Sequence, residues 1–427
     1  MTTTQQDYRL DGIYRQRQEG FFMQRVKLPA GVITAIQARS VAAIAERHAK
    51  GELHLTTRGS IEIHWLREEE LPAVKRALSA VGLTSRGACG GAVRGITCSS
   101  QGAAGFPALE TLARRLQRHF AGNPRFERLP KKFKIGVEAD TSGRRHLIQD
   151  VGLVFAGTDE RGHRYDVYLA GGLGREPQTG FLLEAGVEEQ RIIPLIEAVA
   201  RVYAAHTPAG KRLKHLLRRI GEPAFRLLLS REATSGEVLP PVTGFPENLA
   251  PPAEAGRIEI ERFAGHLTAA DLVRLAELAE TTASGVLMAT ANQNIALHPT
   301  NEADREKTLQ LLKQQGFGIA GQPFRVCPGS HLCRAGLSPT FDIAAALRER
   351  MGENGRQVTW ALSGCPNSCT QPQLADIGII TSGLATDDDG TRSPRFDLCR
   401  LGPEGLGTIT DRSLTLEELY QHVAAID

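Results

Sequence analysis

The chain has 427 residues, of which 41% are hydrophobic and 5% are aromatic, and its formal net charge is +3. A chain of this size can bury a large core and is expected to fold into about two to four domains. The charge is too small, and aromatic residues are too few, for a typical nucleic-acid-binding surface. We therefore expect a globular protein without a nucleic-acid partner.

Neither a membrane span nor a secretory signal is visible in the sequence. No uninterrupted apolar segment could cross a bilayer, and the first residues lack a basic region followed by an apolar run. The seven cysteines are odd in number and unevenly spaced, which argues against a secreted disulfide framework. These features predict a cytoplasmic protein without a membrane partner.

The first periodic unit lies near the amino terminus. A strand-like segment over 21–28 ends at a Pro/Gly turn, and a helix is predicted to begin at Thr34, where Gln37 completes a capping box. Ile36 falls on the expected apolar face of this helix. Two alternating runs within 52–65 then predict a pair of strands joined by a polar turn.

The same unit recurs 234 residues later without a gap. The matching positions pair Ala30-Gly31 with Ala264-Gly265, Thr34 with Thr268, Gly51 with Gly285, Arg58 with Asn292, and His64 with His298. Because the two units agree at this many positions that shape the backbone, we expect an internal duplication. A duplicated chain tends to fold as two halves about a pseudo-twofold axis, and the seam between them is available for a ligand.

The segment between the two copies carries most of the basic motifs. It contains a Gly-rich loop with Arg94, a predicted helix over 109–120 and the basic run Lys131-Lys132-Phe133-Lys134. A basic helical stretch over 211–219 follows, which could be a solvent-facing surface or could dock an acidic electron donor. The Pro/Gly/Glu-rich residues 237–256 are the best candidate for a linker.

Four cysteines fall in two short loops marked by Gly and Pro. Five residues separate Cys327 from Cys333, and three separate Cys365 from Cys369. Four thiolates suit an iron-sulfur cube or a tetrahedral zinc ion, because both take soft sulfur donors. Zinc ribbons favour two-residue gaps in both pairs, so this spacing favours the iron-sulfur cluster. The remaining cysteines are isolated and are interpreted as structural, namely Cys89, Cys98 and Cys399.

These motifs in this order resemble the sulfite/nitrite reductases that contain sirohaem and a 4Fe-4S cluster, from about Phe21 to the end of the chain. The resemblance rests on the cysteine spacing, the Leu55-Thr56-Thr57-Arg58 turn, the Arg94 loop and the Lys-Phe-Lys run. The resemblance implies an α+β fold with duplicated ferredoxin-like half domains plus two sirohaem/cluster-binding α/β domains related by a pseudo-twofold. The implied boundaries are 1–75 for the first half domain, 76–236 for a substrate and sirohaem domain, 237–256 for the linker, 257–322 for the second half domain and 323–427 for the cluster and sirohaem domain.

The resemblance also assigns roles to individual residues. It implies that the cluster ligands are Cys327, Cys333, Cys365 and Cys369, of which Cys369 also bridges to the sirohaem iron. It places four cations at the substrate, Arg25, Arg94, Lys132 and Lys134. It implies that the sirohaem is held by His54, Thr56, Thr57, Arg58, Glu62 and Asn367 together with Cys369.

The chain departs from the family pattern in three places. Gly59 stands where a glutamine is common after the turn arginine, and Glu62 stands where a further glutamine is expected. Gly95 replaces the asparagine that usually follows the arginine equivalent to Arg94. A carboxylate beside the acidic edge of sirohaem needs a proton or a cationic neighbour, so Glu62 needs such a partner.

The first hypothesis for function is six-electron reduction of sulfite to sulfide. The stretch Arg94-Gly-Ile-Thr-Cys98-Ser looks more like the sulfite branch of the family than the nitrite branch. No flavin or nicotinamide motif is visible, so electrons are expected from a separate protein such as ferredoxin or a flavoprotein. The alternatives are reduction of nitrite to ammonia, a cobalamin-pathway precorrin oxygenase, or an iron-sulfur electron carrier without haem, and the retained cations favour a reductase.

Overall fold

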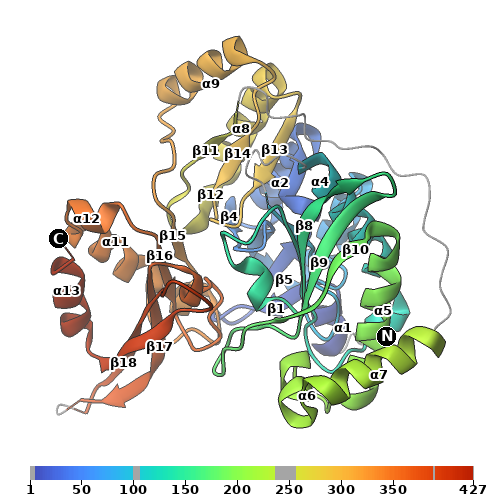
Figure 1. Cartoon of the computed structure of the whole chain (residues 1–427). Coiled ribbons are helices and arrows are strands. Elements are labelled where there is room, and N and C mark those ends of the chain that lie inside the picture. Colours follow the sequence, from blue (N-terminus) through green and yellow to red (C-terminus); the bar gives the residue numbers. More distant parts are fainter. Residues whose placement is uncertain (1–4, 100–105, 236–255, 388–389, 427) are drawn as a thin grey trace.

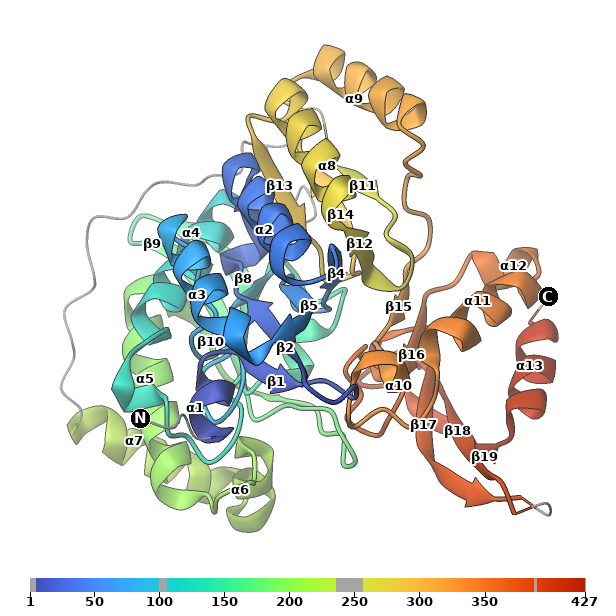
Figure 2. The same cartoon turned by 180° about the vertical axis from the view of Figure 1, so that it is seen from behind.

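The computed structural model describes residues 5–99, 106–235, 256–387 and 390–426. Within these ranges the strands form four sheets. Figures 1 and 2 show the carboxyl-terminal sheet as a separate lobe beside the first half of the chain. Helix α9 (Glu302–Gln314) lies at the outer end of the second ferredoxin-like half domain. No helix in the described ranges is long and apolar enough to cross a membrane. The predicted linker, 237–256, falls almost wholly outside the described residues.

Two of the sheets belong to the duplicated unit. The strand order of the first is β1 (Ile13–Arg15), β2 (Phe21–Val26), β5 (Ile61–Arg67), β4 (Glu52–Leu55) and β12 (His266–Thr268). The order of the second is β11 (Ile258–Ile260), β14 (Ile295–Leu297), β13 (Val286–Ala289) and β3 (Val32–Thr34). The helices that follow these strands are α2 (Ala35–His48), α3 (Leu71–Ala80), α8 (Ala269–Thr282) and α9 (Glu302–Gln314), while α1 (Gln5–Leu10) precedes β1.

The two copies exchange one strand each, which confirms the predicted duplication. β3 pairs with β13 of the second copy, and β12 pairs with β4 of the first. The backbone repeats these contacts, since the Ala35 amide donates to Gly285 O at 2.8 Å and the Ala269 amide donates to Gly51 O at 2.9 Å. Each copy therefore completes the sheet of the other, and the predicted domain boundaries at 75 and 257 do not separate independent sheets.

The predicted helix over 34–48 forms with its capping box, because the Thr34 side chain accepts from the Gln37 amide. The prediction for its apolar face was wrong at Ile36, which is 67% exposed. The buried face instead carries small residues such as Ala38 and Ala42, which pack against α8. Alanines allow the two helices to approach closely, and this tertiary contact outweighs the burial of one isoleucine.

The other two sheets share one topology. One has the order β6 (Thr97–Cys98), β7 (Ile135–Glu138), β8 (Val151–Asp159), β9 (Gly162–Leu169) and β10 (Phe181–Glu188), and the other has β15 (Phe324–Val326), β16 (Trp360–Ser363), β17 (Ile377–Thr386), β18 (Arg392–Arg400) and β19 (Thr408–Leu414). In both, the first two pairings are parallel and the last two are antiparallel. The fold is thus α+β, with two related α/β domains beside the duplicated half domains.

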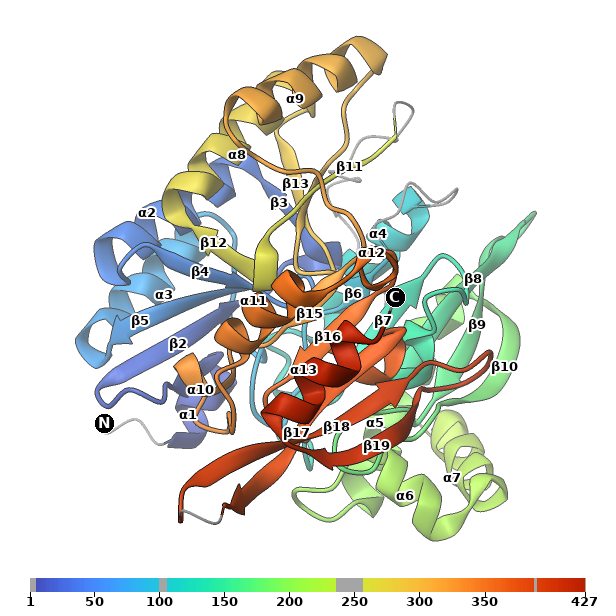
Figure 3. The same cartoon turned by 90° about the vertical axis from the view of Figure 1, so that its left-hand side faces the viewer.

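Helices cover these sheets and connect them. The first α/β domain carries α4 (Phe106–Phe120), α5 (Glu189–His206), α6 (Leu213–Ile220) and α7 (Glu222–Ser235). The second carries α10 (Gly329–Leu332), α11 (Thr340–Arg350), α12 (Glu353–Arg356) and α13 (Leu416–Ala424). Figure 3 shows α11 and α13 on one face of the β15–β19 sheet. The other face of this sheet is left to meet the rest of the molecule.

Glycine makes the closest approaches between the two copies. A Cβ on Gly31 would lie 2.3 Å from Ala289 O, and a Cβ on Gly265 would lie 2.7 Å from Leu55 O. Both glycines have a positive φ, at 79° and 71°. Only a residue without a Cβ fits such a conformation and contact without strain.

Replacing Gly31 or Gly265 with alanine is therefore expected to lower the free energy of unfolding by about 2–4 kcal/mol, because both the backbone and the contact become strained. The measurement is the urea midpoint followed by far-UV circular dichroism. Gly122→Ala is the control, since Gly122 also has a positive φ but no atom lies within 4 Å of its Cβ position. An equal shift in all three variants would show that the contact between copies is unimportant.

Candidate cofactor and oxyanion site

The four predicted cluster ligands lie in loops that leave one edge of the β15–β19 sheet. Cys327 follows β15 and Cys365 follows β16, and these strands are parallel neighbours. Loops at the carboxyl ends of parallel strands meet at the same edge. The Gly364 amide donates to Cys327 Sγ at 3.2 Å, so the two loops are in direct contact.

The thiols form one electrostatic neighbourhood. Burial raises the pKa of Cys327, and the nearby Cys369 raises it further. Burial raises the pKa of Cys333 to about 11, with added contributions from Cys369 and Cys365. All four cysteines are free thiols. Close soft donors with backbone N–H groups directed at sulfur fit the ligand set of an iron-sulfur cluster.

The turn between β4 and β5 reaches the cysteine loops. Thr56 Oγ1 accepts from the backbone amides of Arg58 and Ser60, both at 3.2 Å, and so shapes the turn. Thr57 Oγ1 donates to Cys369 O at 2.8 Å. The predicted sirohaem turn and the predicted bridging cysteine are therefore adjacent.

Gly59 is explained by this turn. Its φ is +58°, and a Cβ would lie 2.7 Å from Ala289 O and 3.2 Å from Gly31 Cα. The second copy of the repeat therefore approaches the turn too closely for the glutamine that the family pattern suggests, unless the backbone shifts.

Arg58 connects the turn to the first α/β domain. Its guanidinium donates to Gln149 Oε1 at 3.0 Å and to Gly95 O at 2.7 Å. Burial and the charge of Arg94 lower the pKa of Arg58 to about 9. Arg58 Nε is buried and has no hydrogen-bond partner among the described residues.

Arg94 and the Lys-Phe-Lys run lie side by side. The Arg94 amide donates to Phe133 O at 2.8 Å, and the Phe133 ring is fully buried against Tyr203. Because side chains alternate along an extended segment, the buried Phe133 places Lys132 and Lys134 together on the opposite side. The sequence motif thus works as an apolar anchor between two cationic side chains.

The cations act on one another and on the cysteine loop. Burial lowers the pKa of Lys132 to about 8, and the charges of Arg212 and Arg94 lower it further, while Cys369 opposes them. Burial and the charge of Lys132 hold the pKa of Lys134 well below its usual range. In the described part of the chain, no carboxylate forms an ion pair with Arg94, Lys132 or Lys134. Uncompensated positive charge of this kind fits an anionic macrocycle and an oxyanion.

Arg25 lies in β2 beside Glu62 in β5. Its Nε donates to Glu62 Oε1 at 3.0 Å, and its Nη2 forms an ion pair with the same carboxylate. Glu62 Oε2 lies 3.5 Å from His54 Nδ1 and 3.4 Å from His64 Nε2. Burial by itself would raise the pKa of Glu62, but Arg25 and the two imidazoles hold it well below its usual range. The cationic neighbour that Glu62 was expected to need is Arg25.

Of the remaining predicted residues, His54 contacts other protein atoms, whereas Asn367 and Cys369 are accessible. His54 Nε2 contacts Ala264 O at 3.0 Å, so both of its ring nitrogens face protein atoms. Asn367 and Cys369 are exposed, which leaves them accessible to a bound group.

Sequence reasoning missed three residues of this neighbourhood. Lys27 is 2% exposed, and burial together with Arg94 and Arg58 lowers its pKa to about 7. Its position two residues after Arg25, where the extended chain continues past β2 in an isolated bridge to Thr84, was the available signal. Arg212 is 4% exposed and donates to Asp150 Oδ2 at 2.8 Å. Cys89 is buried and lies 3.8 Å from Arg25 Nη1, so it lines the cationic region although it was interpreted as structural.

The stretch over 211–219 is less exposed than either interpretation of it required. Arg212 is buried against Asp150, and Lys214 is 2% exposed and donates to Leu173 O at 3.2 Å. Arg218 pairs with Glu176. Several basic residues of this stretch therefore form ion pairs and hydrogen bonds within the protein, and they do not all face a possible partner.

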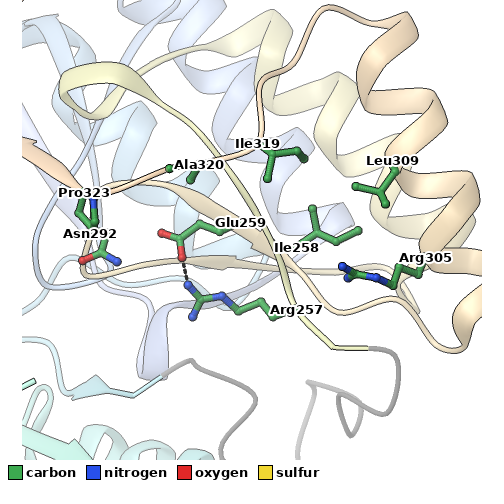
Figure 4. Close-up of a pocket in the computed structure, with 10 residues that line it drawn as sticks. Arg257, Ile258, Glu259, Asn292, Arg305, Leu309, Ile319, Ala320 and Pro323 are labelled. Atoms are coloured by element: carbon green, nitrogen blue, oxygen red, sulfur yellow. Dashed lines mark ion pairs between the residues drawn. The ribbon is translucent and has the colours of Figure 1, made fainter. Parts of the chain in front are cut away.

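A cavity of about 460 Å³ lies elsewhere, beside β11 and α9. Figure 4 shows Arg257, Glu259 and Asn292 along it, with an ion pair between the first two. Asn292 is the repeat counterpart of Arg58, and Glu259 is the counterpart of Arg25. None of the predicted site residues lines this cavity, so it is not the predicted site.

Two family models match the chain. The model of the nitrite/sulfite reductase ferredoxin-like half domain matches residues 14–81 and 257–315. The model of the nitrite and sulphite reductase 4Fe-4S domain matches residues 93–236. The first model thus detects both copies of the repeat.

Similar proteins carry names of two kinds. "Sulfite reductase [ferredoxin] 2" of Mycolicibacterium paratuberculosis is 26% identical over 89% of this chain and 76% of the relative. "Assimilatory ferredoxin-dependent nitrite reductase" of Haloferax mediterranei is 28% identical over 97% of this chain and 79% of the relative. The solved structure of Mycobacterium tuberculosis NirA protein matches the fold with a TM-score of 0.83 at 22% identity, covering 99% of this chain and 87% of that one.

The fold and the four-thiol loops define an iron-sulfur oxidoreductase built on a duplicated scaffold. More narrowly, the chain belongs to the family of sulfite and nitrite reductases that carry sirohaem and a 4Fe-4S cluster. Its donor set and its uncompensated cations fit both cofactors.

Replacing Cys327 with serine is expected to remove the four cluster irons, because the hydroxyl is a hard and weakly acidic ligand. The measurement is iron and acid-labile sulfide per chain in the purified protein. Cys399→Ser is the matched control, since Cys399 is equally free but lies buried in β18. Retention of full cluster content in Cys327→Ser would remove Cys327 from the ligand set.

Proposed function

We propose that the protein reduces sulfite to sulfide in a six-electron reaction, with electrons from a separate ferredoxin-type donor. The observation that supports this most directly is the gathering of Arg25, Arg94, Lys132 and Lys134 next to the Cys369 loop. When bound, the cluster and the sirohaem would pass the electrons of this donor to the substrate.

The protein side chains would bind the substrate and supply protons. The Arg94 guanidinium offers a planar set of N–H donors that suits an oxyanion, and no carboxylate among the described residues competes for it. Lys132 and Lys134 carry ammonium groups whose lowered pKa values favour proton donation from Nζ to an oxygen that leaves as water. Desolvation of these groups strengthens their effect on an anion.

Thr57, Arg58 and Asn367 are proposed to hold the sirohaem, together with Cys369. The contact from Thr57 to Cys369 O supports this, because it fixes the turn against the loop that would carry the bridging thiolate. The ferredoxin donor is proposed because the relatives that use sulfite or nitrite are named as ferredoxin-dependent.

Nitrite is the second candidate substrate. The relatives at similar identity include both sulfite and nitrite reductases, and both substrates are small oxyanions that need the same cations. A precorrin oxygenase or an electron carrier without haem has no use for an oxyanion clamp, so the cation set disfavours both.

Steady-state turnover separates the two substrates. The holoenzyme with a reduced ferredoxin or a chemical reductant is expected to form sulfide from sulfite, with a higher kcat/KM than for ammonia formation from nitrite. A much higher kcat/KM for nitrite would assign the chain to the nitrite reductases, and no turnover of either would refute the proposed reaction.

Lys134→Met is expected to lower kcat for sulfite by about 10²–10⁴-fold, because a general acid contributes roughly that much. The absorption spectrum of the cofactors should stay unchanged, since the change removes only the ammonium group. Lys131→Met is the control, because Lys131 lies three residues earlier in the same basic run but is exposed. Unchanged turnover in Lys134→Met would exclude Lys134 as a proton donor.

A further inference from the structure

Glu62 occupies the centre of a row of side chains across three strands. In the sheet register Glu62 pairs with Arg25 on one side and with His54 on the other. His64, two residues along the same strand, faces the same carboxylate at 3.4 Å. Three basic side chains therefore converge on one buried acid, which is 5% exposed.

This arrangement fixes the carboxylate on Arg25. One oxygen accepts from Nε and Nη2 of Arg25, while the other faces His54 Nδ1 and His64 Nε2. Because His54 is itself held at Ala264 O, the carboxylate cannot turn away from Arg25 without losing these contacts. Glu62 therefore both orients Arg25 and cancels most of its charge.

The other cations of the site lack such a partner among the described residues, as shown for Arg94, Lys132 and Lys134. The net positive charge that faces the oxyanion is thus one unit lower than the number of arginines and lysines suggests. A dianion feels such a change about twice as strongly as a monoanion, because the interaction energy is proportional to the product of the charges. Sulfite above the second pKa of sulfurous acid is a dianion, whereas nitrite is a monoanion.

We propose that Glu62 is a specificity-determining residue that lowers the preference of this site for dianionic over monoanionic oxyanions by neutralising Arg25. The proposal rests on the proposed function, in that Arg25 must face the substrate. It assigns Glu62 a role toward Arg25 that differs from the predicted contact with sirohaem. A neutral glutamine at this position would keep the shape and leave the charge of Arg25 uncompensated.

The test compares Glu62→Gln with the parent enzyme on both substrates, above the second pKa of sulfurous acid. The ratio of kcat/KM for sulfite to kcat/KM for nitrite is expected to rise about 10- to 20-fold, as one unit charge roughly 10 Å away gives at an effective dielectric constant of about 20. The dissociation constants of sulfite and nitrite are measured by spectral titration of the oxidised holoenzyme. The affinity for sulfite should rise relative to the affinity for nitrite. An unchanged ratio would overturn the proposal.

Two further variants separate charge from structure. Glu62→Asp keeps the charge and shortens the side chain, so its ratio should stay within about twofold of the parent even if both activities fall. Glu259→Gln makes the same chemical change at the repeat counterpart of Arg25, where the carboxylate pairs with Arg257, and its ratio should not change. A ratio that shifts equally in all three variants would indicate a general structural effect and contradict the proposal.

The remaining outcomes are also distinct. Loss of the sirohaem absorption in Glu62→Gln would show that Glu62 holds the cofactor and would overturn the proposal. If the parent enzyme reduces neither substrate, the proposed function fails, while the two dissociation constants still test Glu62. If both anions bind the parent and Glu62→Gln in the same ratio, Glu62 does not set specificity, whichever substrate is turned over.

Discussion

The exchange of β3 and β12 between the two copies is the constraint on which the site depends. Each half completes the sheet of the other, and glycines allow the backbones to approach at Ala289 O and Leu55 O. The locked halves hold the β4–β5 turn against the Cys369 loop through Thr57. Residues separated by more than three hundred positions therefore meet with a fixed geometry.

A second consequence of this packing is a region of concentrated positive charge. It contains Arg25, Lys27, Arg58, Arg94, Lys132, Lys134 and Arg212, against the buried carboxylates Glu62 and Asp150. Burying cations without equal negative charge is unfavourable, and the lowered pKa values of Lys27, Arg58, Arg94, Lys132 and Lys134 reflect that cost. An acidic cofactor and an oxyanion bound at the proposed site would offset this cost, so the unfavourable charge of the protein would contribute to affinity for these ligands.

The duplication has diverged in chemistry while its backbone has stayed similar. Arg25, Arg58 and Glu62 in the first copy correspond to Glu259, Asn292 and Ala296 in the second. Ala296 packs in the core shared with the first α/β domain, whereas Glu62 faces Arg25. At position 62 the first copy thus carries a charged side chain of the candidate site, whereas Ala296 of the second copy adds to the apolar core.

The sequence by itself determined the repeat, the capped helix at Thr34 and the two cysteine pairs, because glycine positions, caps and ligand spacing are local signals. Lys132 and Lys134 were indicated only by the resemblance to the reductase family, because a basic run by itself is equally typical of a solvent-exposed surface. Only the tertiary structure decided that Lys27 and Arg212 join them, that Ile36 is exposed, and that Glu62 binds Arg25. These outcomes depend on contacts between distant strands and on the burial of charge, which a linear pattern does not encode.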